Sequence, residues 1–242
     1  REVRLKGRPY LAGLVNDQDG RPVEGPARAE GYADYLVRER IQQRTVQTPQ
    51  GAREARYVRF RLVNDYLDRQ ARRYEPLVER NAQRFGISKS LVFAVMKTES
   101  SFNPFAVSSA PAYGLMQLVP STGGRDAFRM VEGYDHTPSK EYLFQPAHNI
   151  ELGTAYLSLL DGRYLGGIQN PTTREYCTIS AYNGGAGNVL RMFAKDRKVA
   201  VQRINALPPS DVYRRLRREH PRAETRRYLG KVLEARREFV NI

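Results

Sequence analysis

The sequence predicts a mainly α protein in which a small α+β module, residues 1–65, precedes a larger helical domain, residues 66–242. Two patterns lead to this prediction. Apolar and polar residues alternate over 52–63, as they do in a strand that buries one face. After that stretch, apolar residues recur with helical spacing, and Gly and Pro separate the segments. A chain of 242 residues is long enough for one large or two small domains.

The N-terminal module is expected to contain strands and one helix. A first strand is expected over 2–15, where the turn residues NDQDG follow it. The helix is expected over 25–41, because Tyr32 and Leu36 fall on one face. The string QTPQGA (47–52) then breaks the chain before the second strand.

The alternating segment 52–63 gives that second strand two different faces. One face is apolar and is expected to be buried, whereas the other carries a tyrosine and two arginines and is expected to be exposed. The residues of the face expected to be buried are Val58, Phe60 and Leu62.

Helical patterns account for the rest of the chain. The expected segments are 65–86, 89–102, 121–132, 147–162, 171–182, 187–195, 208–219 and 222–239. We expect Pro76 to break the first of them and Gly86 to end it. Ser88 is expected to cap the second, which Asn103 and Pro104 end.

Several functional classes find no support in the sequence. No apolar run approaches about 18 residues, so no membrane-spanning helix is expected. The single cysteine, Cys177, excludes an internal disulfide and is expected in the core. The three histidines are scattered without metal-ligand spacing, so no metal site is expected. The chain has neither a phosphate-binding glycine loop nor a GxSxG motif.

The chain is strongly basic, with a formal net charge of +14 and a pI of 10.1. The excess of Lys and Arg lies before residue 87 and after residue 190, around a nearly neutral middle. A basic surface attracts polyanions, including acidic wall polymers and nucleic acids, although solvated helix faces explain the same excess. Because the basic stretches carry no nucleic-acid recognition motif, we expect no nucleic-acid partner.

The string MKTESSFNP (96–104) places a glutamate where a core residue is expected. Glu99 follows Val92, Val95 and Met96 at helical spacing and continues their apolar stripe. Burial disfavours the charged form, and a carboxylic acid that stays protonated near neutral pH can donate a proton to a leaving oxygen. The alternative is an ordinary glutamate at a helix end whose carboxylate bends out to solvent.

Polar and flexible positions farther along favour a site near this glutamate. Gly114 and Gln117 follow the Asn-Pro turn, and the Gln117 amide can both donate and accept hydrogen bonds. The glycine-rich bend in ISAYNGGAGNVL (179–190) allows Tyr182 and Asn183 to approach a ligand. Each feature also has a plain structural explanation, as a buried amide and as an ordinary helix–helix turn.

Four motifs follow one another along the chain: ESSFNP (99–104), GLMQ (114–117), AYNGGAG (181–187) and ETRRYLGKVLEA (224–235). In this order and spacing they resemble the lysozyme-like lytic transglycosylase family, whose members act on bacterial peptidoglycan. The string NIELGTAYL also fits that family. The resemblance covers residues 66–242, is faint over 1–65, and implies a helical catalytic domain with the lysozyme-like fold of the goose type.

The resemblance assigns roles to individual residues. Glu99 matches the family's single catalytic acid and base. The residues that match substrate-binding positions are Ser108, Met116, Gln117, Tyr182, Asn183 and Tyr228. The family commonly has Ala-Gly-Ala where this chain has Ala110-Pro111-Ala112. Proline fixes φ and lacks an N–H, so this loop is expected to differ, and Ser109 is the alternative to Ser108.

The resemblance also implies a reaction and a location. The reaction is cleavage of the β-1,4 bond between N-acetylmuramic acid and N-acetylglucosamine without water, giving 1,6-anhydromuramyl products. No metal or organic cofactor is expected. The partner would be the glycan strands of peptidoglycan in the periplasm, with a lipid anchor upstream of Arg1 holding the protein to the outer membrane.

Two other functions stay open. A hydrolytic muramidase of the goose-lysozyme type would share the fold but use water, and a non-catalytic wall-binding module would need no acid. Glycosidases generally use two carboxylates, yet the other acidic residues of 87–190 fall in expected turns or helix starts. The sequence therefore gives no second catalytic carboxylate.

Overall fold

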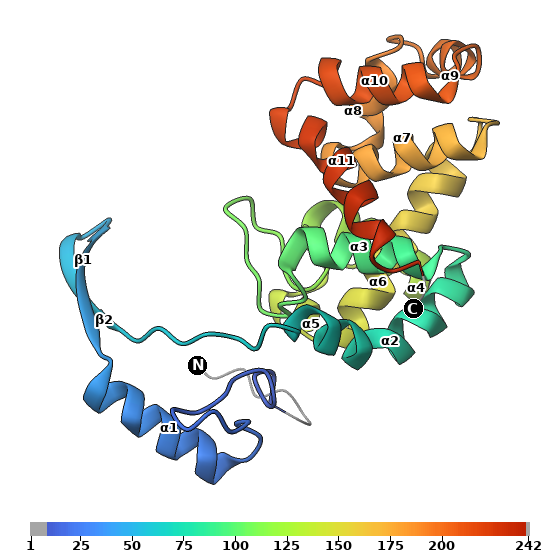
Figure 1. Ribbon diagram of the computed structural model, residues 1–242. Helices are drawn as coiled ribbons and strands as arrows, with labels where there is room; N and C mark the ends of the chain where they lie inside the picture. The colour runs from blue at the N-terminus through green and yellow to red at the C-terminus, as the bar shows by residue number, and fades with distance from the viewer. Residues whose placement is uncertain (1–8, 241–242) are drawn as a thin grey trace. The chain divides into compact units, whose positions relative to one another are not determined.

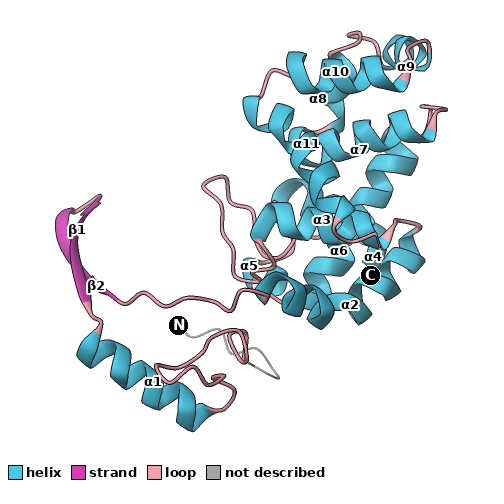
Figure 2. Ribbon diagram, in the orientation of Figure 1, coloured by secondary structure: helices cyan, strands magenta, loops and turns pink. Residues whose placement is uncertain are grey.

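The computed structural model describes residues 9–240 and divides into two compact units, Arg1–Gln70 and Ala71–Ile242 (Figure 1). The first unit contains one helix and a two-stranded sheet, and the second is helical (Figure 2). This arrangement confirms the predicted fold class. The division falls inside helix α2 (Tyr66–Phe85), shortly after the point at which the helical domain is expected to begin.

The first unit is a helix followed by a hairpin. Its elements are α1 (Pro26–Glu39), β1 (Gln42–Thr48) and β2 (Gly51–Tyr57). The helix expected over 25–41 is confirmed, and proline at its first position suits a helix start because its missing N–H has no partner there anyway. The strands are antiparallel with Gln42 opposite Tyr57, and the turn between them lies in the string expected to break the chain.

The strand expected over 2–15 is not formed in the described part of that range. Residues 1–8 lie outside the described residues, and 10–13 form turns in which the Ala12 N–H donates to the Pro9 carbonyl at 3.0 Å. Proline has no N–H to give to a sheet, and the turn hydrogen bonds take the place of a ladder.

The prediction of a strand over 52–63 is correct only for its first half, because β2 ends at Tyr57. The chain beyond it meets the first part of the unit at an isolated bridge between Leu62 and Val15. Val58 and Leu62 are half-buried, whereas Phe60 is 42% exposed, so the expectation that all three are buried is wrong for Phe60.

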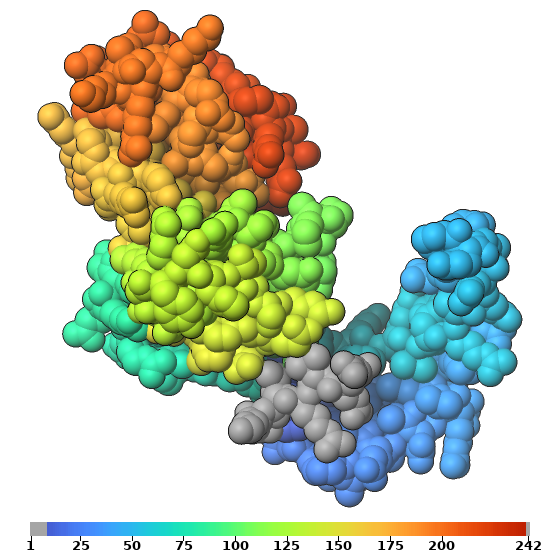
Figure 3. Space-filling view, turned by 180° about the vertical axis from the view of Figure 1, so that it is seen from behind, coloured from blue at the N-terminus to red at the C-terminus, as the bar shows by residue number. Residues whose placement is uncertain are grey.

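The second unit packs its helices around α3 (Lys89–Ser100), whose residues 91–96 are all buried. The remaining α-helices are α4 (Arg125–Glu132), α5 (Lys140–Leu143), α6 (Pro146–Ser158), α7 (Pro171–Gly184), α8 (Ala186–Arg191), α9 (Arg197–Asn205), α10 (Pro209–Glu219) and α11 (Ala223–Arg237). Two π-helical segments, η1 (Pro120–Gly124) and η2 (Leu159–Tyr164), join them. Helix α11 packs against both α3 and α7, and its red atoms lie beside the orange α7 region in Figure 3.

Several helix limits differ from those expected. Helix α2 continues through Pro76, since burial of Tyr74 and Val78 on either side outweighs the lost hydrogen bond. It ends where expected, at Gly86 with φ +68°. Ser88 precedes α3, but its side chain makes no capping hydrogen bond. The short helices α5 and α9 were not among the expected segments, because neither is long enough to show a clear helical period.

Arg236 of α11 holds α3 and α7 together. Its guanidinium donates to the hydroxyl oxygens of Ser90, at 3.1 Å, and Ser88, at 3.3 Å, and forms an ion pair with Glu175 of α7. A guanidinium is suited to this task because its donors point in several fixed directions. The clamp therefore fixes the start of the helix that carries Glu99.

One further feature matches the sequence analysis. Cys177 is a buried free cysteine in α7, and burial raises the pKa of its thiol to about 12. Among residues 9–240, no helix combines the length and the apolar character that crossing a bilayer requires.

The turn at Gly114 generates a stability prediction. Its φ is +79°, and a Cβ there would lie 2.3 Å from Nδ2 of Asn149 and 2.4 Å from the backbone oxygen of Leu143. We expect Gly114→Ala to lose about 3 kcal/mol or more of unfolding free energy, from backbone strain plus overlap. The matched control is Gly133→Ala, which has φ +80° and no atom within 4 Å, and which should lose only about 1–2 kcal/mol. Equal losses in urea denaturation would contradict the prediction.

Candidate active site

Glu99 lies in the last turn of α3, just before a sharp reversal of the chain. The first two residues after α3, Ser101 and Phe102, have positive φ values of 48° and 62°, which residues with side chains rarely adopt. The strain is tolerated because the Phe102 ring is fully buried and packs against Phe93 and Phe239. The helix thus ends before the Asn-Pro stop expected from the sequence, and a buried ring fixes the position of Glu99.

The segment 113–117 runs back past the end of α3. The Ser100 hydroxyl lies within hydrogen-bond distance of the carbonyl oxygen of Leu115, at 2.7 Å, and of Met96, at 3.0 Å. Because Ser100 follows Glu99 directly, this contact sets the glutamate's distance from the segment.

Asn149 of α6 holds the same segment from the other side, and it is fully buried. Its amide nitrogen donates to the carbonyl oxygens of Tyr113, at 2.9 Å, and Leu143, at 2.7 Å. Its amide oxygen accepts from the Met116 N–H at 2.8 Å. One buried side chain therefore satisfies three backbone groups that would otherwise be costly to bury. Sequence reasoning missed this role, although the string NIELGTAYL contained the residue.

Two predicted substrate-binding residues lie in this segment and are engaged by the protein itself. The Met116 side chain is buried, and its backbone oxygen accepts a hydrogen bond of 2.8 Å from the Tyr182 hydroxyl. Gln117 has φ +48°, and its amide nitrogen donates to the carbonyl oxygens of Ala106 and Gly114, both at 2.9 Å. Gln117 is partly buried, so its amide oxygen is the atom left to meet a ligand.

Two buried tyrosine hydroxyls interact electrostatically with the Glu99 carboxyl. Tyr182 comes from α7 and Tyr228 from α11, and burial first, then the Glu99 charge, raises the pKa of both phenols well above the ordinary value. Both groups therefore stay protonated, but the Tyr182 hydroxyl already donates to the Met116 carbonyl oxygen, which leaves Tyr228 as the available donor. The Tyr228 hydroxyl is buried and has no partner of full hydrogen-bond geometry among residues 9–240. It is available to a ligand or to the carboxylate.

The surroundings of Glu99 make it a weak acid. Removal from water is the main cause that raises the pKa of its carboxyl to about 7. A contact with the Tyr228 hydroxyl, too distorted to count as a full hydrogen bond, lowers the pKa and offsets part of this rise. The charge of Glu224 raises the pKa further. The residue is only partly buried, so the carboxyl is both desolvated and within reach of a ligand. This is the condition required of a general acid near neutral pH.

Asn183 connects the end of α7 to the first turn of α11. Its amide nitrogen donates to Glu224 at 3.1 Å, and its amide oxygen accepts from the Thr225 hydroxyl at 2.6 Å. The helices come this close because Gly184 has no side chain, and a Cβ there would lie 2.9 Å from both His220 and Thr225. Gly185 follows with φ +85° and makes the expected bend.

Ser108 is exposed and lies in a loop that closes on itself. Its hydroxyl donates to the carbonyl oxygen of Ala110 and accepts from the Ala112 N–H at 3.4 Å. Ser109 is exposed as well. The structure places neither hydroxyl in a hydrogen bond with Glu99, so the choice between the two serines stays a prediction.

Glu224 is the one acidic residue described as acting on the Glu99 carboxyl, and sequence reasoning missed it because it lies outside 87–190. Other acidic side chains are engaged elsewhere: Asp135 with Arg125 and Glu151 with Arg84. Among the residues that the structure describes, no three His, Cys, Asp or Glu side chains gather as metal ligands would. The site is therefore one weakly acidic carboxyl that interacts with two buried phenols and with the charge of a second carboxylate.

Residues 76–205, more than half of the chain, match the family model of the transglycosylase SLT domain. The chain belongs to this family. Residues 1–73 match a second family model, the N-terminal domain of membrane-bound lytic murein transglycosylase C. The sequence resemblance to lytic transglycosylases is confirmed for the helical part, and the faint resemblance of the first part has a match of its own.

Curated relatives agree with both family matches. The membrane-bound lytic murein transglycosylase C of Yersinia enterocolitica is 47% identical over 238 residues, covering 98% of this chain and 65% of the relative. The protein of the same name from Yersinia pestis is 46% identical over the same span. The strings YLGGIQNPTTREY (164–176) and INALPPSDVY (204–213) point to the same branch of the SLT family. The chain spans about two thirds of the length of these relatives.

Solved structures show the same fold as the helical unit. The 70 kDa soluble lytic transglycosylase from Escherichia coli is 25% identical with a TM-score of 0.52, covering 69% of this chain and 24% of that one. A complex of a 70-kDa soluble lytic transglycosylase with bulgecin A is 25% identical with a TM-score of 0.55, covering 74% and 26%. The lysozyme-like fold expected of an SLT domain is thereby confirmed.

The raised pKa of Glu99 generates a prediction for stability. The ordinary pKa of the carboxyl is 4.5, and the folded value is about 7, so the folded state holds this proton more tightly than the unfolded state. Wild type should therefore lose stability, relative to Glu99→Gln, as the pH rises from about 4.5 to 7. The variant should be more stable at pH 8 by roughly 1–3 kcal/mol and similar at pH 4.

Urea denaturation at the two pH values measures this difference. The control is Glu219→Gln, which removes one exposed carboxylate at the end of α10 and should show no gain that grows with pH. A constant difference between Glu99→Gln and wild type would mean that the Glu99 pKa is ordinary.

Proposed function

We propose that this chain is a peptidoglycan lytic transglycosylase that cleaves the β-1,4 bond from N-acetylmuramic acid to N-acetylglucosamine without water, forming 1,6-anhydromuramyl ends. The observation that supports it best is the Glu99 carboxyl, whose pKa burial raises to about 7 and which interacts with two protonated tyrosines. The SLT family membership and the names of the relatives support the same conclusion. Because the chain spans only part of those relatives, the activity is our proposal for this chain.

In the first half of the reaction Glu99 acts as an acid. Its protonated carboxyl donates a proton to the bridging oxygen, and the bond to C1 of the muramic acid breaks. The positive charge that develops is shared with the ring oxygen or with the sugar's own N-acetyl group. The nearby Tyr228 hydroxyl can then donate to the new Glu99 carboxylate and stabilise it.

In the second half Glu99 acts as a base. The carboxylate takes the proton of the C6 hydroxyl, whose oxygen attacks C1 of the same sugar and closes the anhydro ring. The proton balance is zero, so the enzyme returns to its starting form. Water must be kept away from C1, and the desolvation that raises the pKa of Glu99 also describes a site poor in water.

The remaining predicted residues hold the substrate in this proposal. Tyr182 and Asn183 border the acid, and Gln117 and a serine at 108 or 109 contact the sugars. Met116 contributes through its backbone oxygen, which orients Tyr182. Positioning of this kind lowers the barrier because the reacting atoms start close together.

A hydrolytic muramidase is the second candidate, favoured by one observation. Glu224 is an exposed carboxylate that acts electrostatically on Glu99, as a second carboxylate in a hydrolase would. Its hydrogen bond from Asn183 argues for a structural role instead. The products distinguish the two reactions.

We also propose that the full protein is attached to a membrane and works in the periplasm. The relatives are named membrane-bound. Their names also contain murein, which is another word for peptidoglycan. A lipid anchor on the outer membrane is the form of attachment that the family resemblance implies.

The first test of the function is mass spectrometry of the soluble products released from purified sacculi. Wild type should release muropeptides with anhydro ends, and Glu99→Gln should be slower by about 100-fold or more, because proton transfer in both half-reactions is lost. Products heavier by one water, with reducing ends, would make this protein a hydrolase. No products from wild type would leave only a binding module.

A second test uses the pH dependence of the rate. Activity should fall as the pH rises through about 7, because Glu99 must enter the reaction protonated. Glu224→Gln removes a charge that raises the pKa of Glu99, so the decline should begin at lower pH than in wild type. The control Glu219→Gln should leave the profile unchanged. An unshifted profile in Glu224→Gln would show that Glu224 does not act on the acid.

A further inference from the structure

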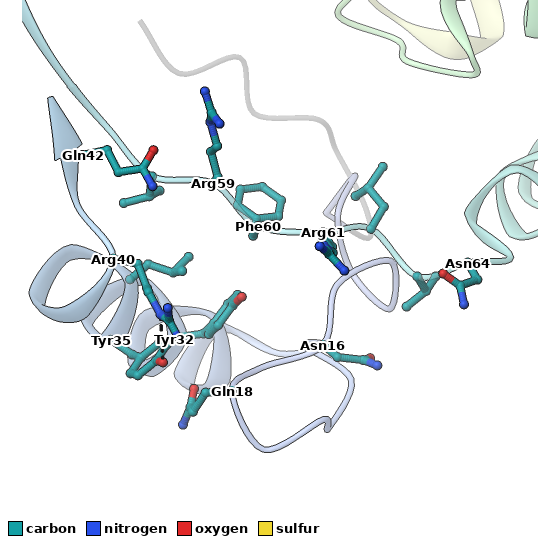
Figure 4. A pocket seen from close by; sticks show the side chains of 14 residues that line it. Asn16, Gln18, Tyr32, Tyr35, Arg40, Gln42, Arg59, Phe60, Arg61 and Asn64 are labelled. Atoms are coloured by element: carbon teal, nitrogen blue, oxygen red, sulfur yellow. Dashed lines mark hydrogen bonds between the residues drawn. The ribbon is translucent and has the colours of Figure 1, made fainter. Parts of the chain in front are cut away.

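A cavity of about 1060 Å³ lies within the first unit (Figure 4). Helix α1 and its C-terminal end form one wall, with Tyr32, Tyr35 and Arg40. The extended segment 58–64 that follows β2 forms the other wall. Sites for small molecules have volumes of roughly 300–1,000 Å³. This cavity is at the upper end of that range, so it has room for a segment of a polymer.

Among the residues that the structure describes, the charged side chains that line this cavity are all positive. They are the three arginines Arg40, Arg59 and Arg61, and no described aspartate or glutamate accompanies them. None of the three forms an ion pair with a carboxylate within the described range 9–240, and all three are exposed. The adjacent Asp17 is already used, because it accepts the N–H groups of Asp19 and Arg21. Arg40 donates to the Tyr35 hydroxyl at 3.3 Å, and the Arg59 guanidinium lies over the Tyr57 ring, 5.3 Å from its centroid. Guanidinium groups that lack a carboxylate partner around a concave surface favour an anionic ligand.

Aromatic faces and free amides accompany this charge. The Tyr32 and Tyr35 rings lie nearly parallel, with centroids 6.2 Å apart and an angle of 13° between their planes. Phe60, on the other wall, is 42% exposed, which is unusual for a ring of that size. The amides of Gln42 and Asn64 also line the cavity and make no hydrogen bond to the residues that the structure describes.

We propose that this cavity is a second, non-catalytic binding site for peptidoglycan, which takes a glycan segment together with the carboxylates of its peptide. The aromatic rings would contact the apolar faces of sugar rings, the amides would bind hydroxyl and N-acetyl groups, and the arginines would bind carboxylates. The inference rests on the proposed function, since it assigns the same polymer to both units.

Nucleic acid is the other polyanion that arginines and aromatic rings can bind. The glycan is favoured because the cavity belongs to a chain whose second unit is an SLT domain. Two sites on one chain raise the effective concentration of the polymer at the catalytic unit, so even a weak site in the first unit increases retention on the wall.

The test measures cosedimentation of the full chain with purified sacculi, using the Glu99→Gln background so that the polymer is not digested. Replacing the cavity arginines by Arg40→Gln, Arg59→Gln and Arg61→Gln should weaken binding about tenfold. The matched control removes three exposed arginines of the same unit that do not line the cavity: Arg38→Gln, Arg53→Gln and Arg56→Gln. It should weaken binding less than twofold.

Phe60→Ala supplies a test that leaves the charge unchanged. It should weaken binding at high and low salt alike, because stacking is not screened, whereas the effect of the arginine variants should shrink as salt increases. Circular dichroism and the melting temperature confirm that each variant is folded.

Three results would overturn the proposal. Equal losses from the two arginine triples would mean that only total charge matters. Unchanged binding in the cavity triple and in Phe60→Ala would mean that the cavity does not meet the wall. If the cavity triple lost binding to a single-stranded oligonucleotide but kept its binding to sacculi, the cavity would be assigned to nucleic acid.

The proposed function can fail independently of this site. With Glu99 intact, the cavity triple should degrade sacculi more slowly but cleave a short soluble glycan at the wild-type rate. If wild type forms no anhydro products, the proposed reaction is wrong. The sedimentation result in the Glu99→Gln background still shows whether the cavity binds peptidoglycan.

Discussion

The hydrogen bonds of Asn149 are the constraint on which the site depends. One buried amide satisfies three backbone groups around the segment 113–117, and that segment then supplies an acceptor to Tyr182 and another to Ser100. Ser100 is the sequence neighbour of Glu99, and Tyr182 interacts with its charge. The surroundings of the acid therefore depend on a buried side chain that makes its hydrogen bonds to the backbone. A single well-satisfied polar group can impose such order because leaving any of its partners unpaired in the interior is costly.

The same arrangement separates two demands on Glu99 that oppose each other. The carboxyl must be removed from water for its pKa to rise, yet it must remain within reach of a glycan. Burial of the helix body and of the Phe102 ring meets the first demand, and the partly open last turn of α3 meets the second. The Tyr228 phenol supplies a donor without supplying charge, so it can stabilise the carboxylate when it forms and leave the neutral acid undisturbed, whereas the Tyr182 hydroxyl donates to the Met116 carbonyl oxygen and braces the segment 113–117.

Local patterns revealed most of this site, and long-range contacts revealed the rest. The stripe that ends in Glu99 and the glycine bend after Asn183 are both short-range signals, and both are visible in the sequence. The roles of Asn149 and Glu224 depend on partners that are distant from them in the sequence, and their neighbouring residues do not indicate which partners these are. The prediction of a strand over 52–63 was half wrong for a related reason, since β2 ends at Tyr57. Alternation shows that one face is apolar, but only the fold decides whether other residues cover Phe60.

Cys177 has a practical consequence for following these events in solution. It is the single cysteine of the sequence, it is buried in α7, and burial raises the pKa of its thiol to about 12. Maleimides react with the thiolate at an accessible surface, so the native residue is inert to them under ordinary labelling conditions. A cysteine introduced beside the arginine-lined cavity would be the sole attachment point for a fluorophore. Occupancy of that cavity could then be read by emission from the otherwise wild-type chain.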